Sequence, residues 1–220
     1  MNNPQKINNR QKGCSRDKAI LQAVEEYRAL NTDQIYSIFF SSLPTGQRKA
    51  QERLTRLHRM AKIQRTRFGD TYTYYHGEKS GLLAHLLGLN WVRIWIEKKC
   101  RSWEQVQSFT YEQDYGILRT DSFVAVKNKV AQTFKFYFVE MDRGTNEFDK
   151  VRKYCQLFKK GDYSSWWWVK LTDRFPPVLI VTTAPRRAET INRLIEIENV
   201  EGLEFRLLLL DEIKREVMNR

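Results

Sequence analysis

The sequence has few of the residues that build disulfide frameworks and metal clusters. Its cysteines, Cys14, Cys100 and Cys155, are odd in number and far apart along the chain. This spacing excludes a disulfide framework and a zinc-finger pattern, and we expect reduced thiols in a cytoplasmic protein. Three histidines, none of them at ligand spacing from another histidine or a cysteine, are interpreted as structural: His58, His76 and His85.

Long apolar runs and nucleotide-binding motifs are also missing. The longest apolar stretch, residues 81–99, is interrupted by His85, Asn90 and Arg93, so we expect no membrane span. The start of the chain, MNNPQKINNRQKG, lacks the apolar core of a signal peptide. No P-loop, dinucleotide fingerprint or nucleophile elbow occurs, and Ser, Cys and His are not grouped as nucleophilic catalysis requires.

Positive charge is what the sequence has in excess, and the excess is local. The net charge is +12. Residues 1–80 hold 15 Lys and Arg against 7 Asp and Glu, whereas residues 81–220 hold 23 against 19. Two thirds of the excess therefore lies in the first third of the chain. Such a concentration favours an anionic partner, most often nucleic acid.

The first third has the pattern of three short helices. Apolar residues recur at helical spacing over 16–28, and Ser15 suits the N-cap position. A second helix follows Thr32, which can cap it. A third helix is predicted over about 47–60, with Ala50, Leu54, Leu57 and Ala61 on one face.

A β-hairpin follows these helices. Residues 62–68 and 71–77 have strand composition and flank a tight turn at Gly69-Asp70. Three helices and a hairpin are the order of a winged helix-turn-helix domain, which inserts its third helix into the DNA major groove. We therefore predict a disordered polar tail over 1–14 and a winged-helix domain over 15–78.

The predicted third helix and hairpin carry the cations that would meet DNA. The candidate DNA-binding residues are Arg48, Lys49, Arg53, Arg56, Arg59, Lys62, Arg65 and Arg67. Arginine can fork onto guanine edges, and we expect Lys49 and Lys62 to contact phosphates. Two alternatives remain open: the arginines only solvate a helix, or the domain binds another protein.

The rest of the chain, residues 79–220, has the pattern of a mixed α/β domain. A connecting helix is predicted within 79–100. It is followed by three strands, a helix, a strand, a helix and a last strand, at about 106–111, 121–126, 133–141, 146–160, 176–183, 185–198 and 203–210. Asp211 can cap a terminal helix.

Carboxylates gather at the end of the third of these strands. Phe138, Glu140 and Asp142 share one strand face, and Asp121 opens the preceding strand. In a hairpin of the two strands, Asp121 and Glu140 would lie close together. Carboxylates at a strand end can ligate Mg²⁺, which would polarise a phosphate and activate a water.

This arrangement resembles the PD-(D/E)XK nuclease superfamily, in which an Asp begins one strand and the next strand ends in Glu-x-Lys. Two positions differ here, because Thr120 replaces the proline and Asp142 replaces the lysine. Some members carry the lysine on the next helix, where Lys150 and Lys153 are the candidates. The resemblance implies these catalytic residues, the first two as Mg²⁺ ligands if the site is active: Asp121, Glu140, Asp142, Lys150 and Lys153.

The chain also resembles the replication-relaxation family of plasmids and other bacterial mobile elements. The marks are RD-x-x-I-L at residues 16–21, R-L-x-x-L at 53–57, E-x-D-R-G-T at 140–145 and K-x-x-x-Y at 150–154. The resemblance implies a winged helix joined to a nuclease-like domain, and a role in replication, transfer or their control. It covers about residues 15–210.

Three functions stay open on these residues. The first is a DNA-binding protein of a mobile element whose nuclease-like domain is degenerate. In that case Asp142 accepts hydrogen bonds at a helix start, Glu140 pairs with Arg143 or a lysine, and the domain binds DNA, replication or transfer proteins, or a second copy as a homodimer. The second is a Mg²⁺-dependent endonuclease or nickase, and the third is a transcriptional repressor.

Two further groups of residues could also meet nucleic acid. The run Trp166-Trp167-Trp168 can stack bases or form core. Arg186 and Arg187 open a helix and can contact phosphate or only solvent.

Overall fold

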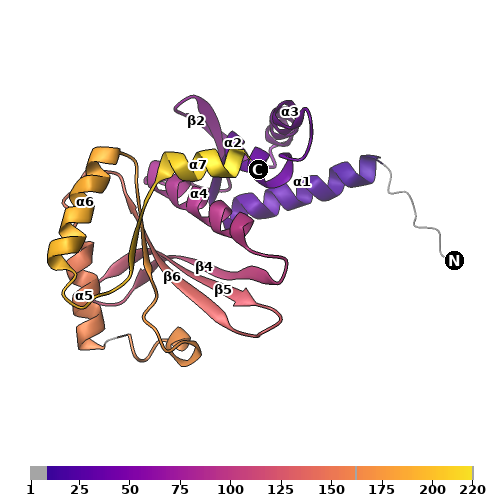
Figure 1. The fold of residues 1–220 in the computed structure, drawn as a ribbon. Coiled ribbons are helices and arrows are strands. Elements are labelled where there is room, and N and C mark those ends of the chain that lie inside the picture. Colours follow the sequence, from indigo (N-terminus) through magenta and orange to yellow (C-terminus); the bar gives the residue numbers. More distant parts are fainter. Residues whose placement is uncertain (1–8, 162, 220) are drawn as a thin grey trace. The chain divides into compact units, whose positions relative to one another are not determined.

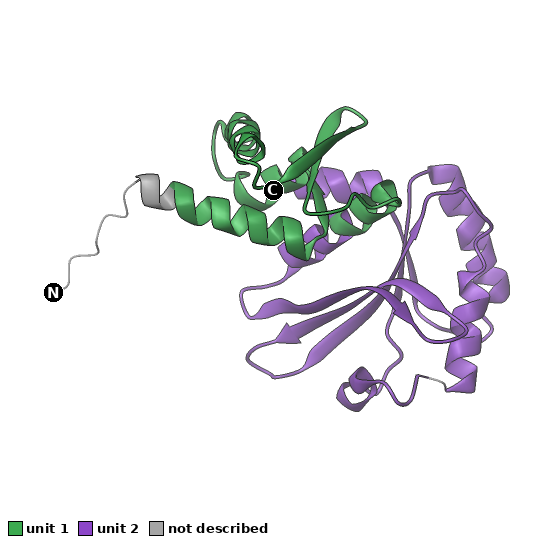
Figure 2. Ribbon diagram, turned by 180° about the vertical axis from the view of Figure 1, so that it is seen from behind, with its two compact units in different colours: residues 1–90, 220 green, residues 91–219 purple. Residues whose placement is uncertain are grey.

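The computed structural model describes residues 9–161 and 163–219, which fall into two compact units (Figure 2). The first unit extends to Asn90 and the second begins at Trp91, so the division falls within helix α4 (Leu83–Lys99). The predicted domain boundary at 78/79 lies before this helix. No helix of the described residues has the length and apolar character needed to cross a bilayer.

The first unit contains the predicted helices and hairpin, together with a short strand that the sequence did not indicate. Its elements are α1 (Asn9–Glu26), β1 (Ala29–Asn31), α2 (Thr32–Phe39), α3 (Gly46–Arg59), β2 (Gln64–Phe68) and β3 (Thr71–Tyr75). The strands pair antiparallel in the order β1-β3-β2. Ile20, Ile35 and Leu54 are fully buried, one from each helix, so the helices share one core above this small sheet.

Two predictions about the helix starts were wrong. Residues 9–14, expected in a disordered tail, belong to α1, so Ser15 lies inside that helix and does not cap it. The rest of the predicted tail, residues 1–8, lies outside the described residues. The N-cap of α2 is Asn31, not Thr32. Its side chain accepts a hydrogen bond from Gln34 N at 2.8 Å, and its own N–H donates to Gln34 Oε1 at 3.0 Å. This capping box fixes two otherwise unpaired groups.

The start of α3 depends on a glycine. A Cβ at Gly46 would lie 2.1 Å from the backbone carbonyl oxygen of Phe40, so Gly46→Ala forces the backbone to move. We expect a loss of about 1–3 kcal/mol in the free energy of unfolding, measured by chemical denaturation. Gly81→Ala is the matched control, because nothing lies within 4 Å of a Cβ there. Equal stabilities of the two variants would contradict this packing.

The second unit is built around one mixed sheet. After α4 its elements are β4 (Glu104–Asp114), β5 (Arg119–Asn128), β6 (Phe134–Asp142), α5 (Lys150–Lys160), the 3-10 helix η1 (Trp167–Leu171), β7 (Val178–Thr182), α6 (Pro185–Glu198), β8 (Phe205–Leu209) and α7 (Leu210–Met218). The strand order is β4-β5-β6-β7-β8. Strands β4, β5 and β6 pair antiparallel, whereas β6, β7 and β8 pair parallel.

Helices cover both faces of this sheet. Figure 1 shows α5 and α6 side by side on one face, where Phe123, Phe138 and Ile180 form a core with Val151 and Ile191 of those helices. The alternate strand residues are buried as well, and α4 and α7 lie beside them, joined by the 2.6 Å hydrogen bond that Trp95 Nε1 donates to Glu216. The predicted mixed α/β composition is confirmed.

Two helix starts in the second unit differ from the prediction. Helix α5 begins at Lys150 and not at residue 146. Asp211 lies in the first turn of α7, whose N-cap is Leu209. Within the tryptophan run, Trp168 is 1% exposed and belongs to the core, whereas Trp167 is 48% exposed. The run therefore serves mainly to close the apolar face of the sheet.

Candidate functional site

The pairing of β5 with β6 brings two carboxylates together. Ser122 lies opposite Val139 in the antiparallel register, which places the preceding residue, Asp121, next to Glu140. The backbone N–H of Met141 donates to Asp121 Oδ2 at 2.7 Å. The Asp121 carboxylate is therefore fixed on the backbone of β6, at the carboxyl end where β6 and β7 run parallel. In open α/β sheets this end is the usual place for a ligand.

Helix α5 adds two polar side chains to this pair. Lys150 and Tyr154 are four residues apart and therefore lie on one face of the helix. Tyr154 Oη donates to Glu140 Oε1 at 2.6 Å. Lys150 Nζ lies 3.0 Å from Glu140 Oε2 and also donates to the carbonyl oxygen of Arg119. The structure thus brings Asp121 and Glu140 together and places Lys150, one of the two lysine candidates, beside Glu140.

Glu140 has a raised pKa in this environment. Its side chain is 1% exposed, and burial, followed by the negative charge of Asp121, raises its pKa to about 8. Lys150 and Tyr154 oppose this shift but do not cancel it. The Lys150 ammonium faces Oε2 at 3.0 Å as an ion pair, and this oxygen has no other polar partner among the described residues. A buried carboxyl group with a raised pKa is a frequent mark of a functional site.

Tyr154 acts toward Glu140 only as a donor. Its hydroxyl is fully buried, and burial together with the Glu140 carboxylate raises its pKa well above the ordinary value. The hydroxyl therefore stays protonated and holds Oε1 in one orientation. In the sequence this tyrosine is distinguished only as the last residue of the K-x-x-x-Y mark. The spacing of four residues from Lys150 was the signal that both side chains face the same point.

Asp142 and Lys153, the other two predicted residues, are engaged elsewhere. Asp142 accepts hydrogen bonds from Arg187 Nε and Nη2 at 3.0 and 3.1 Å and from the Thr182 hydroxyl at 3.1 Å. It is held at the first turn of α6, and Arg187 also donates to Asn146 O at 2.6 Å. Lys153 pairs with Asp149 at 2.6 Å on the surface.

The donor set at this site suits a hard cation but is small. Mg²⁺ prefers carboxylate oxygens, and Asp121 and Glu140 supply them, with the Lys150 ammonium 3.0 Å from one oxygen of Glu140. Across the described ranges, no group of three or more His, Cys, Asp or Glu side chains is placed to hold a metal ion. A metal at this site would rest on these two side chains together with water or a substrate.

The predicted DNA-binding residues form the outer face of α3 and the hairpin of the first unit. Opposite the buried Ala50, Leu54 and Leu57, most of the cations are exposed: Arg48, Lys49, Arg56, Arg59, Lys62 and Arg67. Two are partly buried and engaged within the unit. Arg53 Nε lies 2.7 Å from Asp17 Oδ1, and the Arg65 guanidinium lies 4.2 Å from the centre of the Tyr72 ring.

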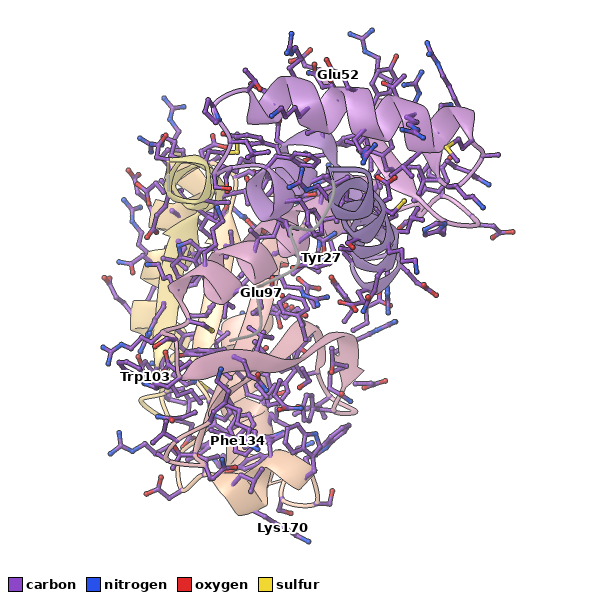
Figure 3. All side chains as sticks on the ribbon, turned by 90° about the vertical axis from the view of Figure 1, so that its right-hand side faces the viewer. Tyr27, Glu52, Glu97, Trp103, Phe134 and Lys170 are labelled. Atoms are coloured by element: carbon purple, nitrogen blue, oxygen red, sulfur yellow. The ribbon has the colours of Figure 1, made fainter. Side chains whose placement is uncertain are left out.

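Arg48, an exposed member of this face, has an acidic neighbour on the same helix. It lies 3.5 Å from Glu52 one turn further along α3, with both side chains open to solvent. Glu52 is labelled in Figure 3. Exposed pairs of this kind contribute little to stability. Arg48 is therefore available to an anionic partner at small cost.

Comparisons of the sequence and the structure with family models, curated proteins and solved structures find no match.

Proposed function

We propose that this protein binds double-stranded DNA through α3 and the β2–β3 hairpin of its first unit. The observation that carries the proposal is the arrangement of α3, in which one face is buried and the opposite face exposes several cations. The element order α1, β1, α2, α3, β2, β3 is that of a winged helix, with α3 as the recognition helix and β2–β3 as the wing. Exposed arginine and lysine side chains on that helix suit phosphates and guanine edges.

The resemblance to the replication-relaxation family indicates the process in which this DNA binding would act. The protein would act in the replication, transfer or transcriptional control of a bacterial plasmid or other mobile element. The second unit would be a PD-(D/E)XK-like domain, an assignment that its strand order and the position of α5 between β6 and β7 support. In this role it adds contacts to DNA, to replication proteins or to a second copy of the chain.

The DNA-binding proposal predicts a specific loss on removing charge from α3. Arg56→Ala combined with Arg59→Ala should weaken the affinity for a mixed-sequence duplex by about tenfold or more near 100 mM salt, because two phosphate contacts are lost. Binding is measured by fluorescence anisotropy. Lys159→Ala combined with Lys160→Ala, two exposed cations at the end of α5, removes the same charge elsewhere. If both double variants lose affinity equally, the protein binds DNA by net charge and not through α3.

The convergence of Asp121, Glu140 and Lys150 favours a second candidate, a metal-dependent DNA endonuclease or nickase. Asp121 and Glu140 would hold the metal. Bound there, Mg²⁺ would polarise a phosphate and activate a water. Tyr154 would keep Glu140 in place, and the Lys150 ammonium would stabilise negative charge that develops on the phosphate.

The nuclease candidate predicts nicking of supercoiled plasmid in Mg²⁺ or Mn²⁺. This activity should be lost in Asp121→Ala, Glu140→Ala and Lys150→Ala and kept in Lys153→Ala, because Lys153 pairs with Asp149 and not with the carboxylates. Products are resolved on agarose gels. If the wild-type protein leaves the plasmid intact while it binds DNA, the nuclease candidate is rejected and the DNA-binding proposal stands.

A further inference from the structure

A basic hollow of about 350 Å³ lies within the first unit, between α1 and α3. Its lining consists of four cations, one carboxylate and one aromatic ring: Arg16, Lys49, Arg53, Arg56, Glu52 and Phe40. Arg16 comes from α1, Phe40 follows α2, and the others belong to α3. The hollow therefore joins the predicted recognition helix to a residue, Arg16, that is not among the predicted DNA contacts.

Arg53 has a structural part in this hollow. Its Nε lies 2.7 Å from Asp17 Oδ1 on α1. Its Nη2 lies where a side chain on α1 would otherwise stand, because a Cβ at Gly13 would be 2.3 Å from it. Arg53 thus links α3 to α1 through its ion pair with Asp17, which offsets its charge. It forms part of the lining of the hollow beside the other cations.

Arg16 is held at the wall of the hollow by an aromatic ring. Its guanidinium carbon lies 5.0 Å from the centre of the Phe40 ring, which is 2% exposed. Such a cation–π contact orients a guanidinium while leaving its N–H donors available. Arg16 is partly buried, so its position is more restricted than that of a surface arginine.

The charges around the hollow do not balance. Asp17 offsets Arg53, and Arg48 offsets Glu52 at 3.5 Å. In the part of the chain that the structure describes, Lys49 and Arg56 have no acidic side chain at ion-pair distance. Three cations, Arg16, Lys49 and Arg56, therefore converge on one concave site beside a single lining carboxylate, Glu52, which pairs with Arg48. A single anion with several oxygen acceptors matches this arrangement.

We propose that this hollow binds one backbone phosphate of the DNA duplex, with Arg16, Lys49 and Arg56 as its donors. This inference rests on the DNA-binding proposal, since α3 contributes two of the three donors. It adds that α1 contacts the backbone beside the groove that α3 enters. Phosphate contacts of this kind fix the position of the protein on the duplex and carry no base specificity.

The charge of Arg16 provides the first test. In the full chain, Arg16→Gln should weaken binding to a mixed-sequence duplex by about tenfold, the effect of one charged hydrogen-bonded contact. It should also reduce the slope of log affinity against log salt by about 0.9. Lys18→Gln, an exposed cation on the same helix, should change neither quantity. Arg16→Lys should restore most of the slope.

A neutral phosphate on the DNA gives the second test. Single methylphosphonate substitutions along the duplex should reveal one position that lowers the affinity of the wild-type protein. The same substitution should not lower the affinity of Arg16→Gln any further, because that variant already lacks the contact. Arg56→Gln should be insensitive to the methylphosphonate at the same position. This second variant keeps the test valid if Arg16→Gln lowers the melting temperature. If Arg16→Gln and Arg56→Gln bind as the wild type does while Arg59→Ala binds weakly, the phosphate site is wrong and the DNA-binding proposal stands. If the wild type ignores DNA, both are wrong.

Discussion

Replacing Glu140 by glutamine should stabilise the protein above pH 8 by on the order of a few kcal/mol. The folded protein holds the Glu140 proton up to about pH 8, whereas the unfolded chain releases it near the ordinary value of 4.5. The contribution of this group to the free energy of unfolding is therefore fully present below pH 4.5. It is lost as the pH rises from 4.5 through about 8. Glutamine keeps the shape and does not titrate, so the variant and the wild type should diverge across this window.

The measurement is chemical denaturation of both proteins at several pH values between 4 and 9. Glu189→Gln serves as the control, because Glu189 is exposed on α6 and should leave the pH profile unchanged. The Lys150 side chain is 22% exposed, so water can solvate its ammonium once the carboxylate is gone. A Glu140→Gln protein that is less stable than the wild type at pH 8 would mean that Glu140 is ionised and that its ion pair with Lys150 stabilises the fold.

Replacing Arg187 by alanine should destabilise the protein by about 3–5 kcal/mol, because it leaves a buried carboxylate without its cation. The Asp142 side chain is 8% exposed and takes two of its hydrogen bonds from Arg187. The same guanidinium donates to Asn146 O, so the variant also frees the loop after β6. The loss is read from the shift of the urea midpoint at constant m-value.

Two variants separate this pair from general effects on α6. Arg186→Ala, at the exposed neighbouring position, should cost little. Adding Asp142→Asn to Arg187→Ala should recover part of the loss, since the amide is neutral and needs no cation. If the double variant loses as much unfolding free energy as the sum of the two single variants, the two side chains act independently. In that case the bidentate pair does not hold this end of the sheet.

Elements of the fold followed from periodicity. Phe134, Phe136 and Phe138 alternate along β6, and Val151, Cys155 and Phe158 recur at helical spacing along α5, because burial on one side imposes its period on the sequence. The starts of helices were less well predicted. Ser15, Thr32 and Asp211 are all good N-cap residues, yet the structure uses Asn31 and Leu209 for α2 and α7. Capping depends on where the chain enters a helix, and local composition alone does not determine this.

The candidate site was predicted in part. The strand pairing that joins Asp121 to Glu140 follows from two neighbouring strands. Placing the lysine on the next helix gave two candidates, Lys150 and Lys153, of which Lys150 lies beside Glu140. The pairing of Asp142 with Arg187 was not predicted, because the two residues are joined only by the parallel pairing of β6 with β7 and the start of α6. Contacts between elements distant in sequence have no periodic signal.

We propose that α3 and the β2–β3 hairpin place several cations on the phosphates of a DNA duplex. The most direct measurement is the affinity of the full wild-type chain for a mixed-sequence duplex across about 50–200 mM salt. If several phosphate contacts form, log affinity should fall linearly with log salt. The slope should be about −0.9 for each contact. A protein that does not bind duplex at the lowest salt, or whose affinity is independent of salt, would contradict the account.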